Sequence, residues 1–146
     1  MMARSAEQVR TPFFLSSVLP NLATRRRLES GGRLLDVGCG SAMFLVKVAE
    51  ALPECRFAGI DINQDEISSA NARIKERGLG ERVQAGIGSA EEMTFDSEFD
   101  LITMLHVFHE VGGQGVTVAN CFRALKPGGQ LVIVDLAYPN SVDDFK

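Results

Sequence analysis

The sequence is poor in cysteine, and this scarcity excludes two kinds of small stabilised domain. Its 146 residues contain three cysteines, Cys39, Cys55 and Cys121, which stand far apart and include no Cys-x-x-Cys pair. Disulfide scaffolds and structural zinc sites need denser or more closely spaced ligands. We therefore expect neither a disulfide framework nor a bound metal.

The sequence also lacks long apolar runs. No stretch of about eighteen consecutive apolar residues is present that could cross a bilayer. Charged residues at Arg4, Glu7 and Arg10 interrupt the N-terminal region, where a secretory signal needs a continuous apolar run. We expect a cytoplasmic protein that has no membrane partner.

Positive charge is not in excess. The chain has 15 basic and 19 acidic residues, which gives a formal net charge of −4. This balance opposes the attraction to phosphate groups on which most nucleic-acid binding depends, so we expect no nucleic-acid partner. The basic cluster Arg25-Arg26-Arg27 is typical of a solvated helix face.

Short apolar runs alternate with longer segments of helical periodicity along most of the chain. This alternation predicts an α/β fold, with a Rossmann-like, doubly wound and mainly parallel sheet between helices. The third strand has the weakest pattern, as expected at a sheet edge, and the fifth is apolar enough for both faces to be covered. The five expected strands are residues 33–37, 56–60, 83–87, 99–105 and 130–136.

A helix is expected before the first strand. Thr11 and Pro12 have the form of an N-cap and a first helical residue, and they open a short apolar helix that runs through Leu19. We expect an N-terminal helical segment, residues 1–30, that covers one end of the sheet. Residues 31–146 would then form the ligand-binding core.

Local signals also place the ends of the later helices. Asn63 is expected to cap the helix after the second strand, with Glu66 as its capping-box partner and Gly78 at its C-terminal end. The segment 127–129, Pro-Gly-Gly, is expected to break the helix after the fourth strand. The expected inner face of that helix comprises Val118, Cys121, Phe122 and Leu125.

A glycine turn directly follows the first strand. Residues 36–42 read Asp-Val-Gly-Cys-Gly-Ser-Ala. In a doubly wound sheet ligands meet the carboxyl ends of the strands, and Gly38 and Gly40 place no side chain between the backbone and a ligand. A turn that needs glycine for conformation alone is the alternative. Met43 stands where the dinucleotide fingerprint has its third glycine, which disfavours NAD or FAD.

Asp61 stands at the end of the second strand, where the fold brings a carboxylate beside the glycine turn. Its two oxygens can accept from two vicinal hydroxyl groups, a geometry that suits a ribose with free 2′ and 3′ positions. Capping of the following helix is the alternative role, but Asn63 fills that role better. Both NAD and S-adenosylmethionine carry such a ribose.

From about Arg33 to Leu136 the sequence resembles the class I S-adenosylmethionine-dependent methyltransferases. The motifs occur in the family's order: its acidic glycine-rich turn as residues 36–42, its ribose ligand as Asp61, its adenine segment as residues 88–95, and its fourth- and fifth-strand motifs as residues 99–102 and 125–129. The resemblance implies methyl transfer from S-adenosylmethionine, with S-adenosylhomocysteine as product.

The resemblance also implies which residues hold the methionyl part of the cofactor. Asp36 and the backbone of Gly38-Cys39-Gly40 would bind it, and Leu105 and His106 would line it by backbone contact. Ala42 replaces the third glycine of the family motif. We expect ordinary helical dihedral angles at Ala42.

At the adenosine end, the resemblance assigns the ribose to Asp61 and one face of the adenine to Ile62. Ser89 would meet the adenine edge by its hydroxyl group, and Ala90 by its backbone N–H. Ser89 stands where many relatives have aspartate, and losing that charged acceptor would weaken adenine binding by about 1 kcal/mol.

His109 is the candidate catalytic residue. Methyl transfer is a displacement at an activated sulfonium, so positioning supplies much of the acceleration, and a base is needed only if the nucleophile must lose a proton. His109 matches a position often held by histidine in the small-molecule methyltransferases that this chain resembles, and imidazole exchanges protons near neutral pH. A histidine that only packs in its loop is the alternative. Glu110 and Asp135 are further candidates.

Methyltransferases of this class normally continue past the fifth strand, whereas this sequence ends at Lys146. We therefore expect a core shortened after the fifth strand, within a longer protein or in a homo-oligomer that covers the strand edge. The lack of basic patches favours a small-molecule acceptor, although protein substrates stay open. A non-catalytic cofactor-binding module and an NAD-dependent oxidoreductase are the alternative functions.

Overall fold

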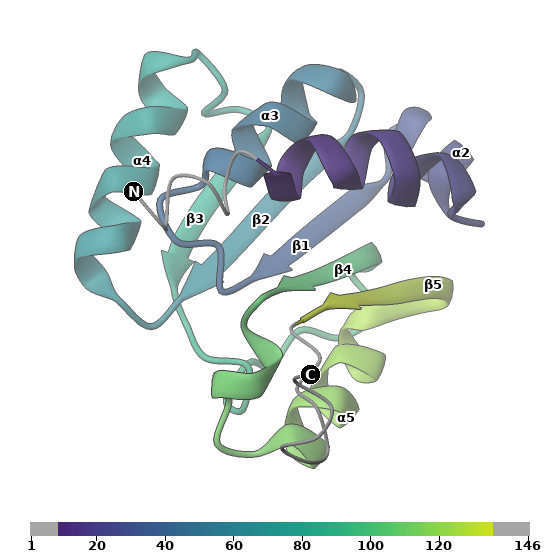
Figure 1. Ribbon diagram of the computed structural model, residues 1–146, viewed down its shortest axis with the longest axis vertical. Helices are drawn as coiled ribbons and strands as arrows, with labels where there is room; N and C mark the ends of the chain where they lie inside the picture. Colours follow the sequence, from purple (N-terminus) through teal and green to yellow (C-terminus); the bar gives the residue numbers. More distant parts are fainter. Residues whose placement is uncertain (1–8, 136–146) are drawn as a thin grey trace, which may run out of the picture.

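Five parallel strands form one sheet in the computed structural model, which describes residues 9–135 (Figure 1). The strand order is β3-β2-β1-β4-β5, so the third strand lies at an edge as predicted. The expected α/β class and doubly wound topology are therefore confirmed. The strands are β1 (Arg33–Val37), β2 (Arg56–Asp61), β3 (Val83–Ile87), β4 (Phe99–Leu105) and β5 (Leu125–Val134).

Helices cover the two faces of the sheet (Figure 1). One core cluster joins α3 and α4 to one face, and a second cluster joins α5 to the other. Every residue of β4 is buried, because this central strand has a strand on each side and packed side chains on each face. The helices are η1 (Phe14–Val18), η2 (Leu19–Asn21), α2 (Arg25–Glu29), α3 (Met43–Ala51), α4 (Gln64–Glu76), η3 (Phe108–Glu110) and α5 (Gln114–Ala124).

The strand order indicates at which end of the sheet a ligand is expected to bind. The chain runs from β1 outward to β3 and then returns to β4 on the other side of β1, which creates a topological switch point between β1 and β4. In open α/β sheets, ligands bind outside the carboxyl ends of the strands at such a point. Among the described residues, no helix is long and apolar enough to cross a membrane.

The N-terminal helical segment packs against α3. The rings of Phe14 and Phe44 meet edge to face with their centroids 5.0 Å apart. Arg10 donates from Nη1 to the carbonyl of Leu105 at 3.2 Å, so the segment also reaches the carboxyl end of β4. The structure already places Arg10 inside the helix, so the prediction that Thr11 is the N-cap was wrong. Proline is tolerated throughout a first helical turn, and it therefore does not fix the starting residue.

The residues that flank α4 at its two ends were predicted correctly, but the capping-box partner of Asn63 was not. Asn63 accepts from the backbone N–H groups of Asp65 and Glu66, and Gly78 follows the helix with a φ of +68°. The backbone N–H of Asn63 donates to Asp61 Oδ1 at 2.9 Å. The carboxylate at the end of β2 thus takes the place that a capping box would give to Glu66.

The inner face of α5 is more polar than predicted. Its buried residues are Thr117, Asn120, Cys121 and Ala124, whereas Phe122 is 64% exposed. Leu125 is buried, but it begins β5 rather than continuing the helix. The apolar spacing failed here because a buried side-chain amide was needed to bind backbone carbonyls of a neighbouring loop.

The fifth strand begins earlier than predicted and lies at the sheet edge. It pairs with β4 from Leu125, with a register shift at the Pro-Gly-Gly segment 127–129, so this segment is an irregularity within the strand. The strand is only partly covered, and Ile133 is 38% exposed. The expectation of two covered faces is therefore wrong for the described residues. Leu136, the predicted last residue, lies outside them.

Arg27 of α2 is exposed together with Arg25 and Arg26, as predicted for this basic cluster, but its guanidinium group also reaches a buried carboxylate. Its Nη1 lies 3.4 Å from Asp100 Oδ1, and Lys126 Nζ lies 3.3 Å from Asp100 Oδ2. The backbone N–H of Arg33 also donates to this buried carboxylate, at 2.9 Å. Two cations and an N–H group thus compensate the charge of Asp100, as a buried carboxylate requires.

Candidate functional site

A cavity of about 180 Å³ lies at the carboxyl ends of β1 and β2. Five of the residues predicted to bind the cofactor line it: Gly38, Asp61, Ile62, Ser89 and Ala90. The fold thus brings together residues that are up to 52 positions apart in the sequence, 38 to 90. The other lining residues are Val37, Gly88, Glu91, Val107, Glu110, Val111 and Gly112.

The glycine turn has the backbone geometry of a ligand-binding loop. Gly38 and Gly40 have φ angles of +78° and +55°, which residues with a side chain rarely adopt. The N–H groups of Gly38 and Cys39 both donate to the carbonyl of Ile60, at 2.8 and 3.0 Å. The turn is therefore fixed to β2.

Ala42 ends this turn in the left-handed conformation, with φ +65° and ψ +23°. The prediction of ordinary helical angles at Ala42 was therefore wrong. Directly before α3, Ala42 takes a conformation that a third glycine would adopt without strain. The alanine methyl group is fully buried.

Asp61 connects the glycine turn to the start of α4. Its Oδ2 accepts from the backbone N–H of Gly40 and its Oδ1 from that of Asn63, both at 2.9 Å. A carboxylate oxygen has a second lone pair, so each oxygen can still accept from a ligand hydroxyl group. The side chain is partly exposed at the cavity and has this capacity available.

Ile62 and Ser89 present two different surfaces to the cavity. Ile62 is 76% exposed, which is unusual for a large apolar side chain and suits contact with a flat apolar ligand. Ser89 Oγ accepts from the backbone N–H of Glu92 at 3.2 Å. Its hydroxyl hydrogen can therefore still be donated.

Asn120, on α5, holds the loop that carries Ser89 and Ala90. Its Nδ2 donates to the carbonyls of Ala90 and Glu91, at 3.0 and 2.9 Å. Sequence reasoning missed this residue, although an amide inside an otherwise apolar helical face is a signal of buried hydrogen bonding. Glu91 Oε1 in turn accepts from the N–H of Gly112 at 3.1 Å, which ties the loop to the segment after β4.

Val107 covers the glycine turn and was also missed. A Cβ atom at Gly38 would lie 2.9 Å from Val107 Cγ1, closer than real Cβ contacts allow. Glycine at position 38 is thus required both by its φ angle and by the close approach of this side chain. With Val107 there, the cavity is smaller than the roughly 300–1,000 Å³ that is usual for a small-molecule site.

The residues predicted at the methionyl end do not line this cavity, apart from Gly38. Asp36 is buried, and its Oδ1 accepts from Thr103 Oγ1 at 2.7 Å. The backbone N–H of His106 donates to the carbonyl of Val134 at 2.6 Å, and the carbonyl of Leu105 accepts from Arg10.

Cys39 is buried below the turn. Burial, reinforced by the charges of Asp36 and Asp61, raises the pKa of the Cys39 thiol to about 12. The thiol is therefore not a nucleophile at neutral pH. Its predicted contribution through the backbone is unaffected.

His109 lies in a small polar cluster after β4. Its Nδ1 is 2.6 Å from Asp135 Oδ1, and its backbone N–H donates to Asp135 Oδ2 at 2.9 Å. Its Nε2 lies 3.5 Å from Glu110 Oε1. The three candidates for the catalytic role, His109, Glu110 and Asp135, therefore lie together. Glu110 also lines the cavity, so the cluster lies beside it.

Known proteins match most of the chain. Residues 28–145 match the family model described as "Methyltransferase domain". A demethylmenaquinone methyltransferase from Listeria welshimeri is 33% identical over 116 residues, which cover 78% of this chain and 49% of that protein. A 27-O-demethylrifamycin SV methyltransferase from Amycolatopsis mediterranei is 30% identical over 115 residues, 78% of this chain and 42% of that protein.

The chain spans about half the length of the curated relatives it matches. A solved structure, a SAM-dependent methyltransferase from Aquifex aeolicus, has the same fold, with a TM-score of 0.71 at 20% identity over 94% of this chain and 76% of that one. The family match, the order of the motifs and the strand order agree. The chain therefore belongs to the methyltransferase domain family.

Proposed function

We propose that this chain binds S-adenosylmethionine at the carboxyl ends of β1 and β2 and serves methyl transfer to a small-molecule acceptor, leaving S-adenosylhomocysteine. The observation that carries the proposal is the cavity that gathers Gly38, Asp61, Ile62, Ser89 and Ala90. The relatives described above are named for a demethylmenaquinone and a demethylrifamycin, which supports a small-molecule acceptor.

The residues present fit the adenosine part of this cofactor. Asp61 offers two carboxylate oxygens with unused lone pairs for the ribose hydroxyl groups, and the exposed Ile62 offers an apolar surface to the adenine. Ser89 and Ala90 would meet the adenine edge. The bound cofactor supplies an electrophilic methyl group on a sulfonium, so the protein itself needs no nucleophile.

The methionyl part would occupy the glycine turn. The backbone of Gly38-Cys39-Gly40 would approach it closely, because φ angles above +50° at both glycines turn the peptide groups outward without side chains. Asp36, Leu105 and His106 would support this end from the strand ends. Val107, which packs directly over Gly38, would border this end.

His109 would act on the acceptor. When Nδ1 donates to Asp135, Nε2 is the nitrogen that can accept a proton from an acceptor hydroxyl group. Asp135 holds both Nδ1 and the backbone N–H of His109, so it is a positioning residue for the imidazole ring. Glu110 Oε1 lies 3.5 Å from Nε2, so this carboxylate would neighbour the proton that Nε2 accepts.

We also propose that the exposed edge of β5 is covered by another segment of protein. Within the described residues β5 is an edge strand with a partly exposed Ile133, and such an edge can pair with another strand. A second copy of the chain or a further segment of a longer protein would cover it. A monodisperse monomer in light scattering, with fast hydrogen exchange along β5, would contradict this proposal.

The test is titration calorimetry of the purified chain with S-adenosylmethionine and separately with NAD. We expect S-adenosylmethionine to bind, and the substitution Asp61→Asn to weaken it about tenfold or more, since hydrogen bonds to a charged group are worth about 1.5–3 kcal/mol. Asp65→Asn, at an exposed position in the first turn of α4, is the matched control and should leave the affinity unchanged. Thermal denaturation of both variants checks that they are folded.

Each alternative function predicts a different outcome. Binding of NAD without S-adenosylmethionine would refute the proposal in favour of an oxidoreductase. Binding of S-adenosylmethionine without transfer to any acceptor would indicate a non-catalytic binding module. A demethylmenaquinone, the acceptor class in the name of the Listeria relative, is the first acceptor to assay.

A further inference from the structure

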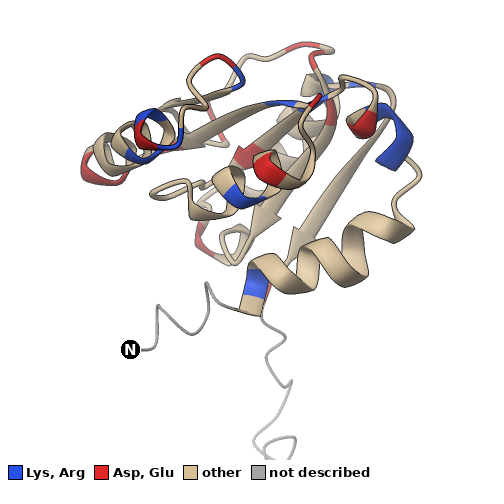
Figure 2. Cartoon of the chain, turned by 90° about the horizontal axis from the view of Figure 1, so that it is seen from above, with Lys and Arg blue, Asp and Glu red and all other residues tan. Residues whose placement is uncertain are grey.

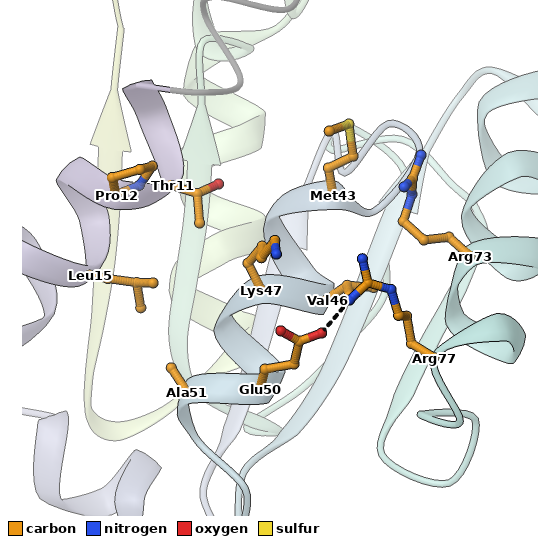
Figure 3. A pocket seen from close by; sticks show the side chains of 10 residues that line it. All are labelled: Thr11, Pro12, Leu15, Met43, Val46, Lys47, Glu50, Ala51, Arg73 and Arg77. Carbon is orange, nitrogen blue, oxygen red and sulfur yellow. Dashed lines mark hydrogen bonds and ion pairs between the residues drawn. The ribbon is translucent and has the colours of Figure 1, made fainter.

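A second cavity lies away from the glycine turn. It is a groove of about 690 Å³ on the outer side of α3, between the N-terminal helical segment and α4 (Figure 3). We call it the α3 groove. Its lining residues are Thr11, Pro12, Leu15, Met43, Val46, Lys47, Glu50, Ala51, Arg73 and Arg77. Its volume is that of a small-molecule site, which usually measures about 300–1,000 Å³.

One wall of the α3 groove and the two ends of its floor are apolar. The N-terminal helical segment has no charged residue between positions 11 and 24, and Figure 2 shows this helix without charged residues along most of its length. Leu15 points across the groove from this segment (Figure 3). Met43, which is 41% exposed, and Ala51 mark the two ends of α3 along the floor. A purely hydrophilic ligand would leave these surfaces in contact with water and gain nothing from them.

The middle of the floor and the α4 side of the groove are charged. Lys47 and Glu50 lie on α3, and Arg73 and Arg77 line the groove from α4 (Figure 3). The local excess of two positive charges contrasts with the net charge of −4 for the whole chain. Charge complementarity therefore favours an anion here.

The cationic side chains are held in place and still have unused donors. Arg77 Nη1 pairs with Glu50 Oε1 at 2.8 Å, and Arg73 Nε donates to the carbonyl of Ser41 at 3.1 Å. A guanidinium group has five N–H donors in a rigid fork that matches a carboxylate. Within residues 9–135, no carboxylate lies within ion-pair distance of Lys47, so its ammonium group is available to a ligand.

We propose that the α3 groove binds an amphipathic anion of the fatty-acid class, an unbranched apolar chain with one terminal carboxylate. The carboxylate is bound by Lys47, Arg73 and Arg77. The apolar chain lies on Leu15 and Ala51. This site is separate from the cavity at the glycine turn, with which it shares no lining residue.

The experiment is titration calorimetry of the intact chain with decanoate, kept well below the concentration at which it forms micelles. Decanol and decyltrimethylammonium are the neutral and cationic comparison compounds of the same chain length. We expect decanoate to bind, decanol to bind roughly tenfold more weakly, and the cation not to bind, because hydrogen bonds to a charged group contribute most of the selectivity. Raising the salt concentration should weaken decanoate binding.

Variants separate the charged and the apolar halves of the site. Lys47→Gln should weaken decanoate binding about threefold, the effect of losing one exposed ion pair. Ala51→Phe should abolish it by filling the apolar end. Lys75→Gln is the control, since Lys75 lies on α4 but does not line the groove, and it should bind decanoate as the unsubstituted chain does.

Three results would overturn the proposal. Decanoate binding that neither Lys47→Gln nor Ala51→Phe changes would place the ligand elsewhere. Decanol binding as tight as that of decanoate would remove the anion site. A dimer in light scattering that Ala51→Phe dissociates, without decanoate binding to the unsubstituted chain, would identify a second copy as the occupant.

Discussion

Replacement of Ala42 by glycine gives a direct test of the backbone at the end of the glycine turn. Ala42 is fully buried and has a φ of +65°, a conformation that costs an L-residue about 1–2 kcal/mol. Ala49, in the interior of α3, is equally buried but helical. The two positions therefore differ chiefly in backbone conformation, and Ala49→Gly is the matched control.

The expected changes in stability are estimated from three energy contributions. Loss of a buried methyl group costs about 0.8 kcal/mol, and glycine in a helix costs about 1 kcal/mol relative to alanine. Ala49→Gly should therefore destabilise the protein by about 2 kcal/mol. Ala42 precedes α3, so the helix-interior cost does not apply there, and the relief of about 1–2 kcal/mol of left-handed strain offsets the loss of the methyl group. Ala42→Gly should therefore lower stability little or not at all.

Urea denaturation followed by circular dichroism measures both variants, since stability changes appear as shifts of the midpoint at a constant slope. We expect a clear decrease in the midpoint for Ala49→Gly and almost none for Ala42→Gly. Equal decreases would show that Ala42 is not left-handed in solution. The reasoning about the glycine turn would then be refuted.

Three further predictions concern the thiols, the adenine loop and the histidine cluster. Burial raises the pKa of the Cys39 thiol from 9.0 to about 12, and the other two cysteines also have raised pKa values. Below pH 9 the thiols should therefore leave the unfolding free energy unaffected. As the pH rises from 9 toward 12, the unfolding free energy should decrease, by about 1 kcal/mol per thiol at pH 10, because in this range the thiols ionise only in the unfolded chain. Asn120→Ala should lower stability by about 1–3 kcal/mol in urea denaturation, since it leaves the carbonyls of Ala90 and Glu91 without their buried donor, and it should weaken S-adenosylmethionine binding in calorimetry. Asp135→Asn should lower kcat with a demethylated acceptor while leaving cofactor affinity unchanged, because Asp135 orients His109 and does not line the cavity.

Each of these has its own control. A variant with all three cysteines replaced by alanine should lose the extra pH dependence above pH 9, and a full dependence in that variant would contradict the thiol assignment. Asn71→Ala, an exposed amide on α4, should leave stability nearly unchanged. If Asp135→Asn lowered cofactor affinity and turnover equally, Asp135 would be part of the cofactor site rather than a positioning residue.

Much of the fold could be predicted from local patterns. The strands β1 to β4 and the α4 boundary at Asn63 and Gly78 are encoded by short apolar runs and by capping residues, which act over a few neighbouring positions. The α5 face could not be predicted in this way. Its inward Asn120 is determined by the carbonyls of a loop 29 and 30 residues away in the sequence, and no periodicity within the helix contains that information.

The features of the candidate site can likewise be separated into those predicted from the sequence and those that only the structure shows. The sequence by itself determined the family, the glycine turn and the carboxylate at Asp61, because these motifs depend on residue type and spacing within single strand-to-helix connections. Only the tertiary structure decided that Val107 lies on Gly38, that Asp135 holds His109 and that Ala42 is left-handed. Each of these depends on how separate segments pack in three dimensions, since a parallel sheet brings together strand ends whose residues share no local pattern.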